Sequence, residues 1–374
     1  MNYIFRKIDQ TYVVWLEKAN RFMQLQEPAF FVFNAWAKGV ESNQVILQCS
    51  YNYELDSRTA RLFVNELISQ FETLLNLQAS AVISQQHHEP VIETGGSGKI
   101  ICHYQISGKN YRFCYAHPEM KSLIHSGLRY TEVFKEDFMP DHIFDLFEQG
   151  EEMGLVLDSA ETGRCPLSKP EQLVGLVNLQ LLNCIYSTDD SFWMGAVYAS
   201  AASSGNGAIL FTAPSGSGKS TFAAVLKHNG YKILTDDFSP ISLKKPHIYP
   251  FPEGISVKAR SVDFLASYYP ALESAAQSLT EGGEEIIPVS ENAHPMPVKA
   301  IVFLKYDPSV DLVFKKRNNL EAMDDFLKQL WLPPITGVVN SFMDWFFDIP
   351  CYSLRYSDTR KAIKSLTPLF VKGL

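Results

Sequence analysis

The sequence predicts a mixed α/β protein with more than one domain. The strongest sign is an apolar strand, Ala208–Thr212, that leads through a Gly/Ser loop directly into a helix. Strands and helices alternate beyond Ser191, as they do in α/β cores. A chain of 374 residues corresponds to about two or three domains of ordinary size. Because 46% of the residues are hydrophobic and 20% charged, disordered, collagen-like and small disulfide-stapled proteins are excluded.

Residues 1–77 have the pattern of one small domain. Tyr12–Leu16 and Phe22–Leu25 are predicted strands, joined by a polar turn. A helix is expected to begin at Pro28, and a short one to lie near Gln44–Gln48. Asp56 and Ser57 then precede a longer helix with apolar residues at helical spacing.

A polar, proline-terminated stretch, 78–98, is the predicted linker to a second domain over 99–374. That domain opens with a hairpin of Lys99–Ile106 and Tyr111–Tyr115 and includes a helix over Pro170–Tyr186. Its nucleotide-binding core is expected to begin at about residue 191.

Charge, cysteine content and hydropathy restrict the partners and the cellular compartment expected for this protein. A formal net charge of −8 argues against nucleic acid as a partner, because neutralising phosphates needs a basic surface. The six cysteines are scattered and expected to be reduced, with a pairing of Cys102 and Cys114 across the hairpin as the alternative. No run is long and apolar enough to span a membrane, and no signal peptide is visible. These features favour a cytoplasmic protein without a membrane partner, and they leave its oligomeric state open.

The sharpest motif is a phosphate-binding loop (P-loop), in which alanine stands where the first glycine is usual. Glycines let backbone N–H groups converge on phosphate oxygens, and the helix N-terminus adds partial positive charge. The lysine of the motif reaches the β- and γ-phosphates of ATP, and the serine hydroxyl after it can ligate Mg²⁺. The predicted nucleotide-binding residues are Ala213, Pro214, Ser215, Gly216, Ser217, Gly218, Lys219, Ser220 and Thr221.

One strand later the chain carries two adjacent carboxylates, Asp236 and Asp237. A single acid would suffice for nucleotide hydrolysis. Two acids suggest that one holds Mg²⁺ while the other accepts the proton of an attacking hydroxyl. The pattern therefore predicts phosphoryl transfer. The alternative without a function is that the two aspartates lie in a solvated turn after a strand.

These motifs resemble the HPr kinase-like family, whose nucleotide-binding core is related to phosphoenolpyruvate carboxykinase. By that resemblance Asp236 is the catalytic base and Asp237 the metal ligand together with Ser220, although the two acids can exchange roles. Lys258 and Arg260 either line the phosphate or substrate pocket or lie on a solvated face. The resemblance rests on Ala213–Thr221, Gly230–Asp237, Pro250–Lys258, Val298–Leu304 and Ile349–Arg355, in that order.

The chain also departs from that family. Relatives often carry a histidine on the strand before the P-loop that supports the aspartate base. Here Phe192–Tyr198 contains no histidine, and Gly195 is the expected match. The signature of enzymes that act on HPr itself is missing too, so activity on HPr is not expected.

The first segment resembles PqqD-like domains, the peptide-binding modules called RiPP recognition elements. The resemblance implies a small winged helix whose open strand edge binds a leader peptide. A structural cap for the second domain is the alternative. The features that carry the resemblance are the strands around Trp15-Leu16 and Met23–Gln26, the helix at Ala29–Trp36 and the long last helix.

Together these features predict an ATP- and Mg²⁺-dependent kinase that phosphorylates a hydroxyl, expected to be a serine, of a precursor peptide. In this scheme Asp236 and Lys219 are catalytic, and the first domain tethers the substrate. Two alternatives stay open: a catalytically weak nucleotide-binding regulator of peptide maturation, and a kinase of a small molecule such as free serine. The sequence does not distinguish ATP from GTP.

Overall fold

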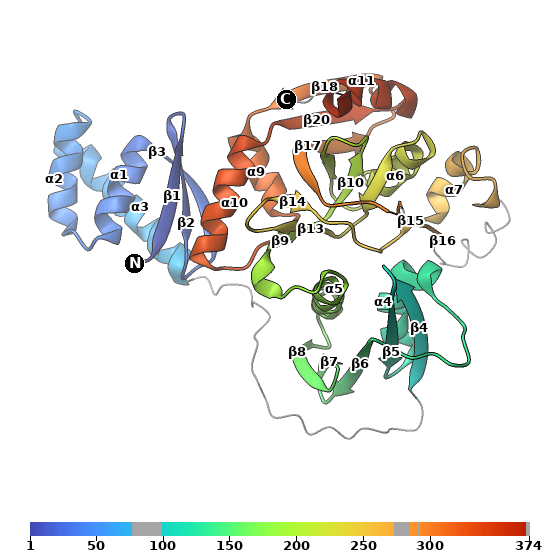
Figure 1. Ribbon diagram of the computed structural model, residues 1–374. Coiled ribbons are helices and arrows are strands. Elements are labelled where there is room, and N and C mark those ends of the chain that lie inside the picture. Colours follow the sequence, from blue (N-terminus) through green and yellow to red (C-terminus); the bar gives the residue numbers. More distant parts are fainter. Residues whose placement is uncertain (77–98, 273–284, 291, 372–374) are drawn as a thin grey trace. The chain divides into compact units, whose positions relative to one another are not determined.

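The computed structural model shown in Figure 1 describes residues 1–76, 99–272, 285–290 and 292–371. The described residues form a mixed α/β structure with several separate sheets. They divide into two compact units. The first is Met1–Val82 with Leu332–Phe346, and the second is Ile83–Trp331 with Phe347–Leu374. The predicted linker, 78–98, lies outside the described residues.

The first unit is built on an antiparallel sheet in the order β1-β2-β3. The two predicted strands are confirmed, and β1 is an additional strand that sequence analysis missed. It was missed because its Arg6-Lys7 pair interrupts the apolar alternation of a half-buried edge strand. The elements are β1 (Tyr3–Ile8), β2 (Thr11–Leu16), β3 (Arg21–Gln26), α1 (Glu27–Ala37), α2 (Ser42–Asn52) and α3 (Ser57–Asn76).

One face of this sheet packs on its own helices, with Val14 and Leu16 in a core that includes Phe33 of α1. The opposite face carries Trp15 and Phe22, which stand opposite each other in the β2–β3 pairing. Side chains alternate between faces along a strand, so the two faces need separate partners.

A helix from far along the chain, α10 (Thr336–Asp348), contacts the second face. The rings of Phe22 and Phe342 have centroids 6.0 Å apart. Arg6 donates from Nε to Asp344 Oδ1 at 2.6 Å and from a terminal nitrogen to Asn340 Oδ1 at 2.7 Å. Phe342, Trp345 and Phe346 of α10 are thus buried in the unit that contains the N-terminus.

The second unit begins with a five-stranded sheet in the order β4-β5-β6-β7-β8. The predicted hairpin is confirmed, with a tight turn at Ser107 and Gly108, both at positive φ. Cys102 stands opposite Phe113 and not Cys114, and all six cysteines are free. The elements are β4 (Ile100–Ile106), β5 (Lys109–Tyr115), α4 (Pro118–Leu128), the 3-10 turn η1 (Arg129–Thr131), β6 (His142–Gln149), β7 (Glu152–Leu157), β8 (Ala160–Pro166) and α5 (Pro170–Tyr186).

The rest of this unit surrounds a ten-stranded sheet whose main path is β12-β10-β11-β17-β14-β13-β9-β19, with β20 and β18 beside β17. Among the described strands of this ten-stranded sheet, only the β11–β17 and β17–β20 pairs are parallel. The strands are β9 (Trp193–Val197), β10 (Ala199–Ser203), β11 (Ala208–Thr212), β12 (Lys232–Thr235), β13 (Ser239–Ser242), β14 (His247–Ile248), β17 (Met296–Tyr306), β18 (Leu312–Arg317), β19 (Leu330–Trp331) and β20 (Cys351–Tyr356).

Helices pack on this sheet, and the Gly/Ser loop lies in the chain between β11 and α6. Phe222 and Val225 of α6 share a core with Phe211 of β11 and Leu366 of α11. No helix of the described residues has the length and apolar character needed to cross a membrane. The remaining elements are the 3-10 turn η2 (Asp190–Phe192), α6 (Lys219–His228), α7 (Ala259–Ala266), α9 (Asn319–Leu327), α11 (Thr359–Val371) and a small two-stranded sheet of β15 (Ile255–Val257) and β16 (Glu285–Ile287).

Candidate functional site

The predicted loop, residues 213–218, connects buried strand β11 to helix α6, which begins at Lys219. Gly216 and Gly218 have φ values of 84° and 95°, a backbone region that L side chains rarely adopt. A Cβ on Gly218 would lie 3.2 Å from Tyr306 Cβ, so this glycine is needed for both its conformation and its small size. The strand–loop–helix arrangement is therefore as the sequence predicts.

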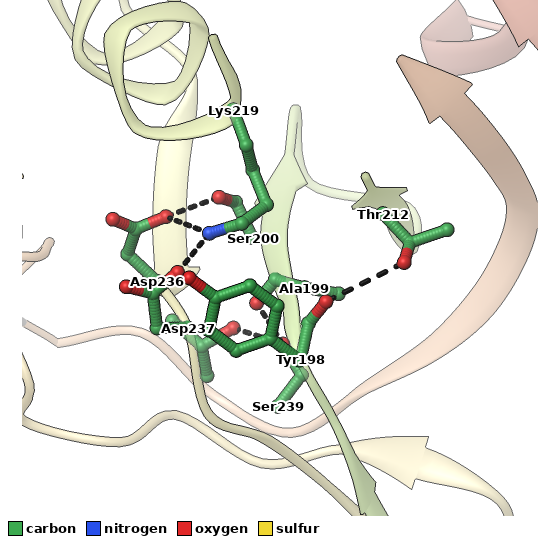
Figure 2. A network of polar contacts seen from close by, with 9 residues as sticks. Tyr198, Ala199, Ser200, Thr212, Lys219, Asp236, Asp237 and Ser239 are labelled. Carbon is green, nitrogen blue, oxygen red and sulfur yellow. Dashed lines mark hydrogen bonds and ion pairs between the residues drawn. The ribbon is translucent and has the colours of Figure 1, made fainter. Parts of the chain in front are cut away.

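Lys219 points from the first turn of α6 toward the two predicted acids (Figure 2). Its Nζ donates to Asp237 Oδ1 and lies 3.3 Å from Asp236 Oδ1. The same ammonium stands 4.7 Å from the centre of the Tyr198 ring. Burial disfavours the charged lysine, but the two carboxylates outweigh burial and raise its pKa above the ordinary value.

The two acids have different surroundings. Asp236 follows β12 and is 1% exposed, whereas the Asp237 side chain is 30% exposed and its backbone has φ 70°. Burial raises the pKa of Asp236, although the nearby Lys219 charge acts in the opposite direction. The pair therefore combines one acid inside the protein with one that solvent reaches.

Asp236 also satisfies a structural test for a metal ligand. Ser200 donates from Oγ to Asp236 Oδ1, while Oδ2 is buried with no hydrogen-bond partner among the described residues. The hydroxyl of Ser220 lies close enough to this carboxyl to lower its pKa. A buried carboxylate oxygen beside Ser220 fits the oxygen ligands that Mg²⁺ prefers.

Two residues of this cluster were not predicted as part of the site. Tyr198 lies between β9 and β10 and bonds to Asp237, and burial together with that charge raises the pKa of its phenol to about 12. Ser200 lies in β10 within a run of small residues. Neither residue belongs to a motif, so only the pairing of β10 with β11 and β12 brings them to the acids.

Gly195, the expected match to the supporting histidine of relatives, has no side chain with which to contact the acids. It pairs with Ile241 of β13 in the sheet. Tyr198 and Ser200 contact the acids instead. The side chain closest to a supporting role is thus a phenol or a hydroxyl, and not an imidazole.

Of the two predicted basic residues, Arg260 lies at the loop. Its guanidinium is 3.3 Å from the place a Cβ on Gly216 would take. Thr221 and Ser261 share a hydrogen bond of 2.9 Å that ties α6 to α7. Lys258 precedes α7 and is exposed.

Comparison of the chain with protein-family models gives no match, and comparison with curated proteins gives none either. The residues of the cluster are therefore the basis for assigning its chemistry. It joins a glycine-rich turn, a buried lysine, a hydroxyl and two carboxylates within the second unit.

Proposed function

We propose that this protein is an ATP- and Mg²⁺-dependent kinase that phosphorylates a hydroxyl group, expected to be a serine, of a precursor peptide. The observation that carries the proposal is the contact of Lys219 at the start of α6 with both Asp236 and Asp237. The resemblance of these motifs to the HPr kinase-like family supports it. A lysine and two acids around a glycine-rich loop are the groups that phosphoryl transfer requires.

The different exposure of the two acids favours the exchanged assignment of their roles. Asp236 is buried beside Ser220, so these two residues would hold Mg²⁺ at the bottom of the site. Asp237 is reached by solvent and therefore by a substrate hydroxyl, which makes it the candidate base. When bound, the metal would neutralise charge on the β- and γ-phosphates.

In the proposed transfer each bond that forms is matched by one that breaks, and a residue of the site takes up the proton. Asp237 takes the proton of the attacking hydroxyl while the new O–P bond forms and the bond from the γ-phosphorus to the β-γ bridging oxygen breaks. Lys219 and the loop amides bind the phosphate oxygens, and ADP leaves. Arg260, beside Gly216, is placed to add a second cation over the same oxygens.

A substitution of Lys219 tests this site. Lys219→Ala should lower phosphate transfer by at least about 100-fold, because the phosphates lose their principal cation. Lys232→Ala, which removes an exposed lysine on β12, is the matched control. Calorimetric titration with Mg·ATP and a phosphorylation assay provide the readouts. Unchanged transfer by folded Lys219→Ala enzyme would remove the proposal.

Peptide capture is assigned to the first unit. In the described residues, β1 and β3 each pair with β2 only, which leaves one open edge on either side. An extended leader peptide can add a strand at such an edge. Phe5 is 42% exposed on β1, and its ring centroid lies 4.8 Å from that of Phe30, so the β1 edge also offers an apolar contact.

Point substitutions test capture better than deletion, because removing residues 1–77 would uncover the Phe342 side of α10. Phe5→Glu and Leu25→Glu place a charge at the β1 and β3 edges, and Leu62→Glu on exposed α3 surface is the control. At least one edge variant should raise KM for a leader-containing peptide by about tenfold and leave KM for its leaderless form unchanged. If neither does so, the structural-cap alternative is favoured.

The absence of a histidine from the described acid cluster keeps the regulator alternative in view. Asp237→Asn distinguishes the two functions, because a kinase loses phosphate transfer while a nucleotide-binding regulator keeps its binding and its effect on a partner enzyme. Assays with free serine beside serine peptides separate the small-molecule alternative. Phosphoserine as the sole product would favour that alternative.

A further inference from the structure

A second cluster of ligand-type side chains lies in the five-stranded part of the second unit, on elements separate from the P-loop. Cys102 comes from β4, His125 from α4, and Glu132 from the residue that follows η1. One ligand atom of each, the cysteine sulfur, a ring nitrogen and a carboxylate oxygen, lie within 4.8 Å of one another. No other group of this kind occurs among residues 1–76, 99–272, 285–290 and 292–371.

The histidine is oriented as metal-binding histidines are. Its Nδ1 shares a hydrogen bond of 2.7 Å with the Tyr104 hydroxyl, which is in turn 2.9 Å from the Tyr115 hydroxyl. These two hydrogen bonds orient the imidazole ring and leave its Nε2 directed toward Glu132, whose Oε2 is 3.9 Å away. A partner on one ring nitrogen that orients the other for coordination is the usual outer arrangement of a metal site.

The surroundings of the cluster combine burial with an opening. Cys102 is 3% exposed, and the side chains of Glu132 and Lys121 both lie beside its sulfur. A pocket of about 340 Å³ is lined by Cys102 and Glu132, with His103 and residues 133–136 on its other sides. A water from this pocket can complete a four-coordinate site.

We propose that Cys102, His125 and Glu132 bind a zinc ion. Sulfur, imidazole and carboxylate together match the ligand preferences of Zn²⁺, whereas Mg²⁺ and Ca²⁺ take oxygen ligands. Around a tetrahedral zinc, such ligand atoms lie about 3.3 to 3.6 Å apart, so the 3.9 Å separation of Nε2 and Oε2 needs little adjustment. The two anionic ligands, a thiolate and a carboxylate, balance the charge of Zn²⁺.

The ion would join three elements that no disulfide connects. It would fasten β4 and α4 to the segment after η1. The turn η1 itself contacts other parts of the unit, because Tyr130 donates to the carbonyl of Pro252 at 2.9 Å and Arg129 pairs with Glu285 of β16 at 2.6 Å. Loss of the proposed ion should therefore loosen this part of the second unit.

Cobalt substitution tests the site in the full-length protein. After metal removal with a chelator, Co²⁺ titration should give a thiolate-to-cobalt charge-transfer band that saturates at one equivalent, and Zn²⁺ should abolish it. Cys102→Ser should lose the band. His125→Gln and Glu132→Gln should each weaken Zn²⁺ binding at least about tenfold. Zn²⁺ should also raise the melting temperature of the wild type but not of Cys102→Ser.

Two controls make the result specific. Cys165→Ser removes another buried free cysteine of the same sheet, and His142→Gln removes a histidine outside the cluster; both should keep the band. Co²⁺ at the P-loop acids gives no thiolate band, so binding there is distinguished. A folded wild type without the band, or a Cys102→Ser protein that retains it, would overturn the proposal.

Discussion

Asp236 is a buried carboxylate in a cluster that contains one lysine for two acids. Lys219 compensates only one negative charge, so the second stays electrostatically unbalanced in the absence of bound cations. Burial therefore prevails and raises the pKa of Asp236. A buried carboxylate with an uncompensated charge lowers the free energy of unfolding, and we expect such a residue to be present because it binds a ligand.

The substitution Asp236→Asn should reveal this loss of stability as a change in how the free energy of unfolding depends on pH. Because the pKa of Asp236 is raised above 3.8, the folded protein binds its proton more tightly than the unfolded chain does. The free energy of unfolding of the wild type then falls as pH rises above that unfolded value. Asp236→Asn lacks this loss, so its stability relative to wild type should increase between about pH 4.5 and pH 8 in urea denaturation.

Asp263→Asn, at an exposed position of α7, serves as the control for changing an aspartate to asparagine. Its stability relative to wild type should stay nearly constant over the same pH range. A constant difference for Asp236→Asn as well would contradict the raised pKa.

At the scale of elements, two glycines on either side of α6 form a matched pair. Gly218 and Gly230 have similar φ values of 95° and 87°, but only Gly218 has neighbours where a Cβ would go. Gly230→Ala should lower the free energy of unfolding by about 1–2 kcal/mol, the cost of left-handed backbone. Gly218→Ala should cost more and also weaken Mg·ATP binding, which calorimetry measures. Equal nucleotide affinities for the two variants would argue against phosphate binding by this loop.

A second prediction at this scale concerns α10. Phe342 is fully buried against Phe22, so Phe342→Ala should lower the free energy of unfolding of the first unit by about 3–5 kcal/mol. Hydrogen exchange should accelerate in β2 even though that strand is more than 300 residues distant in the chain. Phe264→Ala, at an exposed position of α7, should leave this exchange unchanged. Unaltered protection of β2 in Phe342→Ala would show that α10 does not support the sheet.

At the scale of the whole molecule, the order of the chain and its division into units differ. Leu332–Phe346 belongs with the N-terminal unit, although it follows almost all of the second unit in sequence. The chain therefore enters the first unit twice. A fragment of the chain that ends before residue 332 therefore lacks α10, which is part of the first unit.

Cleavage of the chain tests this arrangement. With a protease site inserted within 78–98, the two fragments should remain together in gel filtration, because α10 of the larger fragment binds the sheet of the smaller one. Arg6→Ala combined with Phe342→Ala should let them separate. Dissociation of the unsubstituted fragments at micromolar concentration would contradict the assignment of α10.

Several elements were predictable because their signals are local. The cap at Asp56 accepts from the backbone N–H groups of Arg58 and Thr59, as its position before a helix indicates. The hairpin over Lys99–Tyr115 and the helix at Pro170–Tyr186 were found at nearly their observed bounds. Each depends on residues a few positions apart, which is the range at which sequence patterns act.

The parts that were missed depend on contacts between distant segments. Tyr198 and Ser200 reach the acids through strand pairing, and β1 and α10 find each other across most of the chain. Cys102, His125 and Glu132 are likewise separated in sequence and joined only by packing. No spacing rule encodes such meetings.

The amino-acid sequence by itself determined the glycine-rich loop after β11, its lysine and the acid pair, because each is defined by neighbouring residues and by the backbone freedom of glycine. Tertiary structure decided which acid is buried, which hydroxyls support it, and which helix completes the N-terminal sheet. Burial and electrostatic surroundings arise from the whole folded chain, so they have no local signature.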